Sequence, residues 1–246
     1  MATAYACSSP VVCITSQVDS QAIDGGYGLL HEVNDQLDCV APVTKWRRRV
    51  LQVADVPAVV REAAIQLRSG RPRPVEIEMP PETMEDEGLV ELLPPSEVRP
   101  TTAPARDIDR AAELLLGARA PLIYAGGGVL LSGAHDALAA VAEYLQAGVA
   151  QSPEGKGAVS DHNVLSLGAA FWRDSALRAH IHAADVVLAV GSRLALVTFK
   201  PGTRIVAHDF AFPNWKADVT VDFQGPARIH HLYMWTVPDR KEEEKK

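Results

Sequence analysis

The chain has 246 residues, of which 47% are hydrophobic and 22% charged, and its formal net charge is −7 at pH 7. This composition is typical of a globular protein long enough for one large or two modest domains. The negative charge disfavours a general affinity for nucleic acid or for an anionic membrane. No apolar run approaches the roughly 20 residues of a membrane span, and the N-terminus lacks a signal-peptide pattern. We therefore expect a cytoplasmic protein.

Residues 1–80 have the pattern of an incomplete α/β domain. Residues 11–15 form an apolar run that predicts a strand covered on both faces. A helix is predicted between Asp55, as its N-terminal cap, and Gly70, which ends it. Its apolar stripe consists of Val56, Val59, Val60, Ala63 and Leu67. Residues 75–79 alternate with period 2, which predicts a second strand.

One basic run, from Lys45 to Arg49, stands against the acidic balance of the chain. Four cations beside Trp46 have the chemistry to grip a phosphate backbone. A solvated face or the edge of an interface is the alternative that the same residues allow.

Residues 81–105 form a proline-rich linker with acidic side chains, which predicts an extended spacer and a domain boundary. Residues 106–228 then alternate helical patterns with buried apolar runs. These runs cover residues 121–125, 186–190 and 204–208, and residues 219–221 suggest a short further strand. The pattern predicts a parallel, doubly wound, Rossmann-like domain. Residues 229–246 are interpreted as a polar tail.

A cluster of candidate cofactor-binding residues lies at the expected carboxyl ends of these strands, the edge where parallel sheets bind ligands. Its members are Gly126, Gly127, Gly128, Gly191, Ser192, Arg193 and Asp209. The glycines either let a bound phosphate approach the backbone or let two backbone segments pack closely. Arg193 either holds a phosphate or faces water, and Asp209 either binds ribose hydroxyls or caps a turn. The Rossmann fingerprint is incomplete, because Leu131 occupies the third glycine position.

No catalytic residue and no metal site is predicted from the sequence. The chain lacks a G-x-S-x-G segment, an H-E-x-x-H segment and paired Cys/His ligands.

Several segments, in the correct order, resemble the thiamine-diphosphate-dependent enzymes of the acetolactate synthase, benzoylformate decarboxylase and pyruvate decarboxylase type. Thr15-Ser16-Gln17-Val18 is similar to their T-G-Q-V turn, and residues 70–77 resemble the G-R-P-G-P-V strand of their pyrimidine-binding domain. Residues 126–128, 155–157 and 184–193 resemble their central domain. The resemblance covers most of residues 1–228. It implies the C-terminal half of a pyrimidine-binding domain followed by a central domain.

The resemblance also carries expectations about cofactors and roles. Thiamine diphosphate and magnesium are the cofactors of the family, and Gln17 matches a residue on the substrate side of the cofactor. Some members bind FAD or an adenine nucleotide in the central domain. Ser16 departs from the family's glycine.

The family's activating glutamate and its G-D-G metal segment have no counterpart here. Glu32, the only glutamate among the first fifty residues, follows the strand and turn and cannot be that glutamate. We therefore expect part of a thiamine-diphosphate-dependent decarboxylase or carboligase that is inactive alone. The alternatives are a stand-alone FAD- or ADP-binding module and a non-catalytic subunit, either self-associating or bound to a full-length relative.

Overall fold

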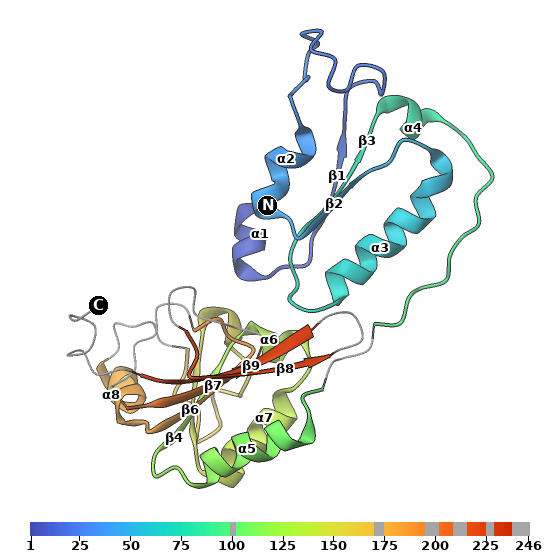
Figure 1. The fold of residues 1–246 in the computed structure, drawn as a ribbon. Coiled ribbons are helices and arrows are strands. Elements are labelled where there is room, and N and C mark those ends of the chain that lie inside the picture. The colour runs from blue at the N-terminus through green and yellow to red at the C-terminus, as the bar shows by residue number, and fades with distance from the viewer. Residues whose placement is uncertain (99–101, 170–174, 195–201, 209–215, 225–228, 238–246) are drawn as a thin grey trace. The chain divides into compact units, whose positions relative to one another are not determined.

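A computed structural model describes residues 1–98, 102–169, 175–194, 202–208, 216–224 and 229–237. The chain divides into two compact units, Met1–Pro100 and Thr101–Lys246, and each has its own sheet (Figure 1). No helix in the described ranges has the length and apolar character needed to cross a membrane.

The first unit is built on a three-stranded parallel sheet in the order β1-β3-β2. α3 covers one face of this sheet, and α1 and α2 lie on the other side (Figure 1). The elements are α1 (Ala2–Cys7), β1 (Val12–Ser16), α2 (Gln36–Val40), η1 (Ala41–Val43), β2 (Trp46–Arg49), η2 (Val53–Asp55), α3 (Val56–Arg68), β3 (Val75–Met79) and α4 (Pro81–Glu85).

The prediction that the first strand is covered on both faces is wrong. β1 is an edge strand, and Val12 and Ile14 are 45% and 62% exposed. Their strand register places them on the same face as Val75 and Ile77. α3 packs on β2 and β3 at that face, so it protects Val75 and Ile77 but leaves the side chains of β1 in contact with solvent.

The central strand β3 is buried on both faces, although its sequence alternates apolar and charged residues. Val75 and Ile77 pack against Val59 and Ala63 of α3. Glu76 and Glu78 point to the opposite face and are fully buried. The period-2 pattern therefore predicted the strand correctly, while the charged positions do not face water.

α3 was predicted within two residues of its observed bounds, but two details of the prediction are wrong. Asp55 makes no side-chain cap, because the short turn η2 already gives it helical backbone angles. Val60 belongs to the predicted apolar stripe yet is 51% exposed.

The second unit contains a six-stranded sheet in the order β5-β4-β6-β7-β9-β8. The first four strands are parallel to one another, and β9 pairs antiparallel with both β7 and β8. The expectation of an α/β fold dominated by parallel strands is confirmed. The elements are α5 (Ala105–Leu116), β4 (Pro121–Ala125), α6 (Gly127–Leu131), α7 (His135–Leu145), β5 (Gly148–Gln151), η3 (Pro153–Gly155), α8 (Ser175–Ala183), β6 (Val186–Val190), β7 (Arg204–His208), β8 (Val219–Gln224) and β9 (Ile229–Thr236).

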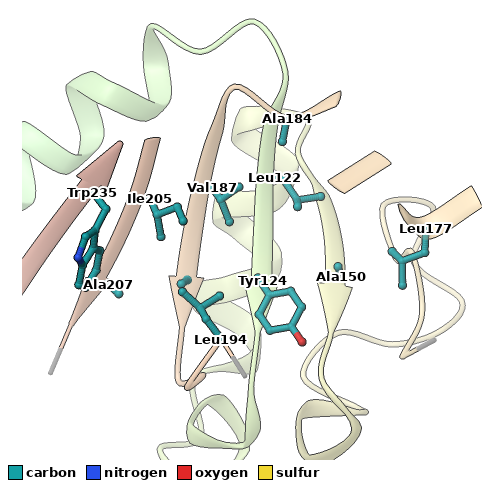
Figure 2. Close-up of a cluster of buried hydrophobic side chains, with 11 residues drawn as sticks. Leu122, Tyr124, Ala150, Leu177, Ala184, Val187, Leu194, Ile205, Ala207 and Trp235 are labelled. Carbon is teal, nitrogen blue, oxygen red and sulfur yellow. The ribbon is translucent and has the colours of Figure 1, made fainter. Parts of the chain in front are cut away.

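Both faces of this sheet carry buried side chains, as a doubly wound fold requires. Ile123 of β4 packs with Leu138 and Ala142 of α7 on one face. Leu122 and Tyr124 face the other side, where Leu177 of α8 joins the cluster shown in Figure 2. The alternation along β4 thus separates the two hydrophobic layers.

The predicted polar tail is wrong for its first part, because residues 229–236 form strand β9. β9 pairs with β7 and β8, and Trp235 is only 1% exposed within the cluster of Figure 2. Met234 packs on the opposite face of the sheet. Consecutive large apolar residues therefore supply both layers of the core.

Candidate functional site

The glycine-rich turn that follows β4 lies directly against the end of β6. The Gly126 N–H donates to Val190 O over 2.8 Å, and the Gly128 N–H donates to Gly191 O over 3.0 Å. A Cβ added at Gly126 would stand 2.3 Å from Gly191 O, and one at Gly128 would stand 2.6 Å from Gly191 Cα. No side chain fits between the two backbone segments.

Gly191 completes this contact from the other side. Its φ of +58° is in the left-handed region, and a Cβ there would stand 2.6 Å from the Val129 nitrogen. Glycine is therefore required at Gly191 both by conformation and by space. Among the two alternatives that the sequence left open, close backbone packing accounts for Gly126, Gly128 and Gly191. The N–H groups of Gly126 and Gly128 already have acceptors within the fold, so they do not point at an open phosphate cradle.

The loop after β5 packs on the same turn. A Cβ added at Gly155 would stand 2.4 Å from Ala125 O, and the Ser152 N–H donates to that oxygen over 2.8 Å. Ser152 Oγ accepts from the Gly155 N–H over 3.0 Å. Gly127 is less confined, because its nearest neighbour is Glu154 O at 3.0 Å.

Two polar residues at this edge were not predicted from the sequence. Gln151, at the end of β5, is 1% exposed, and its Oε1 accepts from the N–H groups of Gly157 and Val159. Tyr124, one residue before the end of β4, lies with Leu122 on the face shown in Figure 2, whereas Gln151 pairs with Ala125 and lies on the opposite face. Burial, followed by the negative charge of Glu154, raises the pKa of the Tyr124 hydroxyl. Their signal in the sequence was only their position at the ends of buried strands.

Ser192 and Arg193 follow β6, as predicted. Ser192 Oγ accepts from the Leu194 N–H over 3.0 Å, and both Ser192 and Arg193 are half-buried. Asp209, the last member of the predicted set, lies outside the described residues. The assignment of this set to a cofactor therefore stays a prediction.

Gln17 lies at the carboxyl end of β1 in the first unit. It is 7% exposed, its N–H donates to Met79 O over 2.9 Å, and its Oε1 accepts from the Val18 N–H over 2.7 Å. The adjacent Ser16 carbonyl accepts from Gln36 Nε2 over 2.7 Å. The turn that resembles T-G-Q-V is thus fixed by backbone and side-chain hydrogen bonds.

A chain of hydrogen bonds connects this turn to the buried face of β3. Gln36 Nε2 donates to Thr15 Oγ1 over 3.2 Å, and Thr15 Oγ1 donates to Glu76 Oε1 over 2.8 Å. Burial raises the pKa of Glu76, while the Thr15 hydroxyl opposes that rise. The chain of bonds anchors the start of α2 on β1.

The basic run of the sequence is largely engaged within the first unit. Lys45 Nζ donates to three carbonyls, those of Gln66, Ser69 and Arg71. Arg47 pairs with Asp38 over 2.9 Å, and Arg49 pairs with the buried Glu78. These contacts give the run an internal structural role, which neither predicted alternative described.

The described residues do not assemble a thiamine diphosphate–magnesium site. Within the described ranges, no group of three or more His, Cys, Asp or Glu side chains has the arrangement of a metal site. Both carboxylate oxygens of Glu32 are bonded to backbone N–H groups of its own loop. Glu32 is therefore engaged within its own loop and is not a free acid for activating the cofactor.

Comparison with known proteins gives consistent matches. Residues 108–227 match the thiamine pyrophosphate enzyme central domain family. A "probable acetolactate synthase large subunit" from Methanococcus aeolicus is 34% identical over 236 residues, covering 90% of this chain and 39% of that protein. A "probable 2-ketoarginine decarboxylase" from Pseudomonas aeruginosa is 35% identical over 206 residues, covering 80% and 35%. The acetolactate synthase isozyme 3 large subunit of Escherichia coli is 32% identical over 200 residues, covering 78% and 34%.

The chain therefore spans about two fifths, or somewhat less, of the length of these relatives. The matched residues 108–227 include the parallel strands β4 to β7 and also β8, and the longer matches extend through the first unit as well. On these grounds the chain belongs to the thiamine-diphosphate-dependent enzyme superfamily.

Proposed function

We propose that this chain is part of a thiamine-diphosphate-dependent decarboxylase or carboligase of the acetolactate synthase type. It contributes a segment of the pyrimidine-binding domain and the central domain. The observation that carries the proposal is the central-domain match over residues 108–227, joined to relatives that align with about nine tenths of the chain. Gln17 supports it, since it is held at the carboxyl end of a parallel strand, where such sheets bind ligands.

Residues 1–246 on their own are proposed to be inactive toward 2-oxo acids. Thiamine diphosphate supplies the carbanion-stabilising chemistry when it is bound, and magnesium holds its diphosphate. Within the described residues no cluster of His, Cys, Asp or Glu side chains has the arrangement of a metal site, and Glu32 is bonded to backbone N–H groups of its own loop. Purified chain should show no turnover of pyruvate or benzoylformate with added thiamine diphosphate and magnesium. Sustained turnover would contradict this part of the proposal.

A chimaera tests the family function directly. In it, this chain replaces the aligned segment of the Methanococcus aeolicus relative, and acetolactate formation from pyruvate is measured. We expect activity in the chimaera and at least about a tenfold loss on Gln17→Ala, because a positioned hydrogen-bonding group at a reacting centre typically contributes that much. Gln21→Ala is the matched control, since Gln21 is exposed on the same loop. Equal activities of the two variants would remove Gln17 from the site.

An FAD or ADP site in the second unit is the alternative for the central domain. It rests on Ser192 and Arg193 at the end of β6, because the N–H groups of Gly126 and Gly128 have acceptors within the fold. Calorimetric titration with FAD and with ADP, repeated on Arg193→Ala, tests it. Binding that Arg193→Ala abolishes supports the alternative, and absence of heat with both nucleotides leaves the domain structural. The partner-subunit alternative predicts co-elution of this chain with the full-length relative.

A further inference from the structure

A single carboxylate organises the loop that connects β1 to α2. Oε1 of Glu32 accepts from the Gly26 N–H over 2.7 Å and from the Tyr27 N–H over 3.1 Å. Oε2 accepts from the Leu29 N–H over 2.9 Å. Three backbone donors from four consecutive residues therefore converge on one side chain.

The backbone of the loop is shaped for this convergence. Asp24, Gly26, Gly28 and His31 all have positive φ, between 61° and 71°. Left-handed residues that alternate with ordinary ones turn successive N–H groups toward one point, which makes a concave anion-binding nest. At Gly26 and Gly28 the conformation carries no side-chain penalty, and an added Cβ would meet nothing within 4 Å. The glycines therefore shape the nest rather than make room for a neighbour.

Side-chain packing contributes little to holding this loop. Tyr27 is 69% exposed, Leu29 46% and Leu30 83%, although all three are large and apolar. The ring of Tyr27 lies against Gly25 within the loop. Apolar residues in an unsupported loop tend to collapse onto the nearest apolar surface. Something other than a core must keep them extended.

We propose that Glu32 is a built-in anion that closes the nest of residues 26–29 and latches the loop in the conformation that presents Tyr27, Leu29 and Leu30 to solvent. The latch is a conformational device of the first unit and does not depend on the proposed function. The latch also gives a structural role to Glu32, the one glutamate of the first fifty residues. The sequence showed only that Glu32 cannot be the activating glutamate of the family.

The electrostatics agree with this geometry. The backbone N–H of Leu29 is the largest influence on Glu32 and lowers its pKa; slight burial opposes this, and the N–H groups of Gly26, Tyr27 and Gly28 lower the pKa further. No charged side chain is among these causes. Because the folded-state pKa is below the ordinary value of 4.5, the latch is fully formed above that pH and is lost as the pH falls through the lowered pKa.

Amide hydrogen exchange in the whole chain, resolved by NMR, tests the latch. In Glu32→Ala the amides of Gly26, Tyr27 and Leu29 should exchange at least about tenfold faster, since each loses a charge-assisted acceptor. Asp35→Ala is the matched control: Asp35 is also a capping carboxylate of this segment, but it accepts from the Asp38 N–H. The control should speed exchange at Asp38 and leave the three nest amides unchanged. Unchanged β3 amides in both variants verify that the fold is intact.

Chemical rescue separates an anion nest from a merely crowded loop. Added formate should slow exchange of the three amides in Glu32→Ala toward the native rate, while chloride at equal ionic strength should not. Glu32→Gln, which keeps the shape but not the charge, should also speed exchange of the three amides. Formate should slow that exchange less than in Glu32→Ala, because the glutamine side chain still fills the nest. Native exchange rates at the three amides in Glu32→Ala, or equal loosening of them in Asp35→Ala, would overturn the proposal. Failure of formate to slow exchange would also overturn it.

Discussion

Replacing Gly191 by alanine measures how much the contact between β4 and β6 depends on the absence of a side chain. The new Cβ would stand 2.6 Å from the Val129 nitrogen and 2.7 Å from Gly128 Cα, both backbone atoms that cannot rotate away. The left-handed conformation alone costs a non-glycine residue about 1–2 kcal/mol. Forcing extra volume into a packed site adds about 1–3 kcal/mol. We therefore expect Gly191→Ala to destabilise the second unit by about 2–5 kcal/mol.

Gly133→Ala is a closely matched control. Gly133 has φ +65°, close to the +58° of Gly191, but an added Cβ would meet nothing within 4 Å. It should lose only the conformational part, about 1–2 kcal/mol. The difference between the variants isolates the close approach.

Native-state hydrogen exchange of the full chain, followed at amides of β4 and β6 across a urea series, reports the stability of this unit by itself. The measurement is made without any nucleotide. If Gly191→Ala lost no more stability than Gly133→Ala, close packing would not explain the glycine, and approach of a ligand would again be the better explanation.

Two further substitutions test other parts of the fold. Lys45→Met keeps the aliphatic stem but removes the ammonium from three carbonyls at the end of α3, so the first unit should lose about 1–3 kcal/mol. Arg48→Met, at an exposed residue of β2, should be nearly neutral. Equal effects would show that the contacts of the Lys45 ammonium contribute nothing. Trp235→Ala should destabilise the second unit by about 3–5 kcal/mol because the indole is buried, while Tyr144→Ala, 78% exposed, should change stability little. A neutral Trp235→Ala would mean that β9 does not contribute to the core.

The sequence correctly predicted the strands whose side chains are buried on both faces of the sheet. The apolar runs that became β4, β6 and β7 pack between two layers of side chains, so hydrophobicity alone located them. β1 has a similarly apolar sequence, but composition does not say which strand of a sheet a helix covers. The exposure of Val12 and Ile14 was therefore not predicted; it arises because α3 packs on β2 and β3.

Other features depended on contacts between segments far apart in the chain. Whether a glycine makes room for backbone or for a ligand is decided by what lies opposite, and for Gly128 that is Gly191, 63 residues away in the sequence numbering. The contacts of Lys45 and Arg49 could likewise not be predicted, because their partners lie at the end of α3 and on β3, far away in the sequence. β9 was not predicted, because a charged segment follows it and its pairing with β7 and β8 leaves no local signal in the sequence. Glu32 left only a weak signal, a glutamate shortly after three closely spaced glycines.

The outer edge of β1 has a practical consequence for handling the protein. The Gln17 N–H and the Val11 carbonyl bond to β3, so in a parallel ladder the backbone groups of Val12 and Ile14 point away from the sheet. Unpaired backbone beside two exposed branched side chains is a template on which another extended chain adds by hydrogen bonding. In concentrated samples or during overexpression this edge is where precipitation should begin. A lysine in place of Ile14 would work as a gatekeeper against it without touching the core.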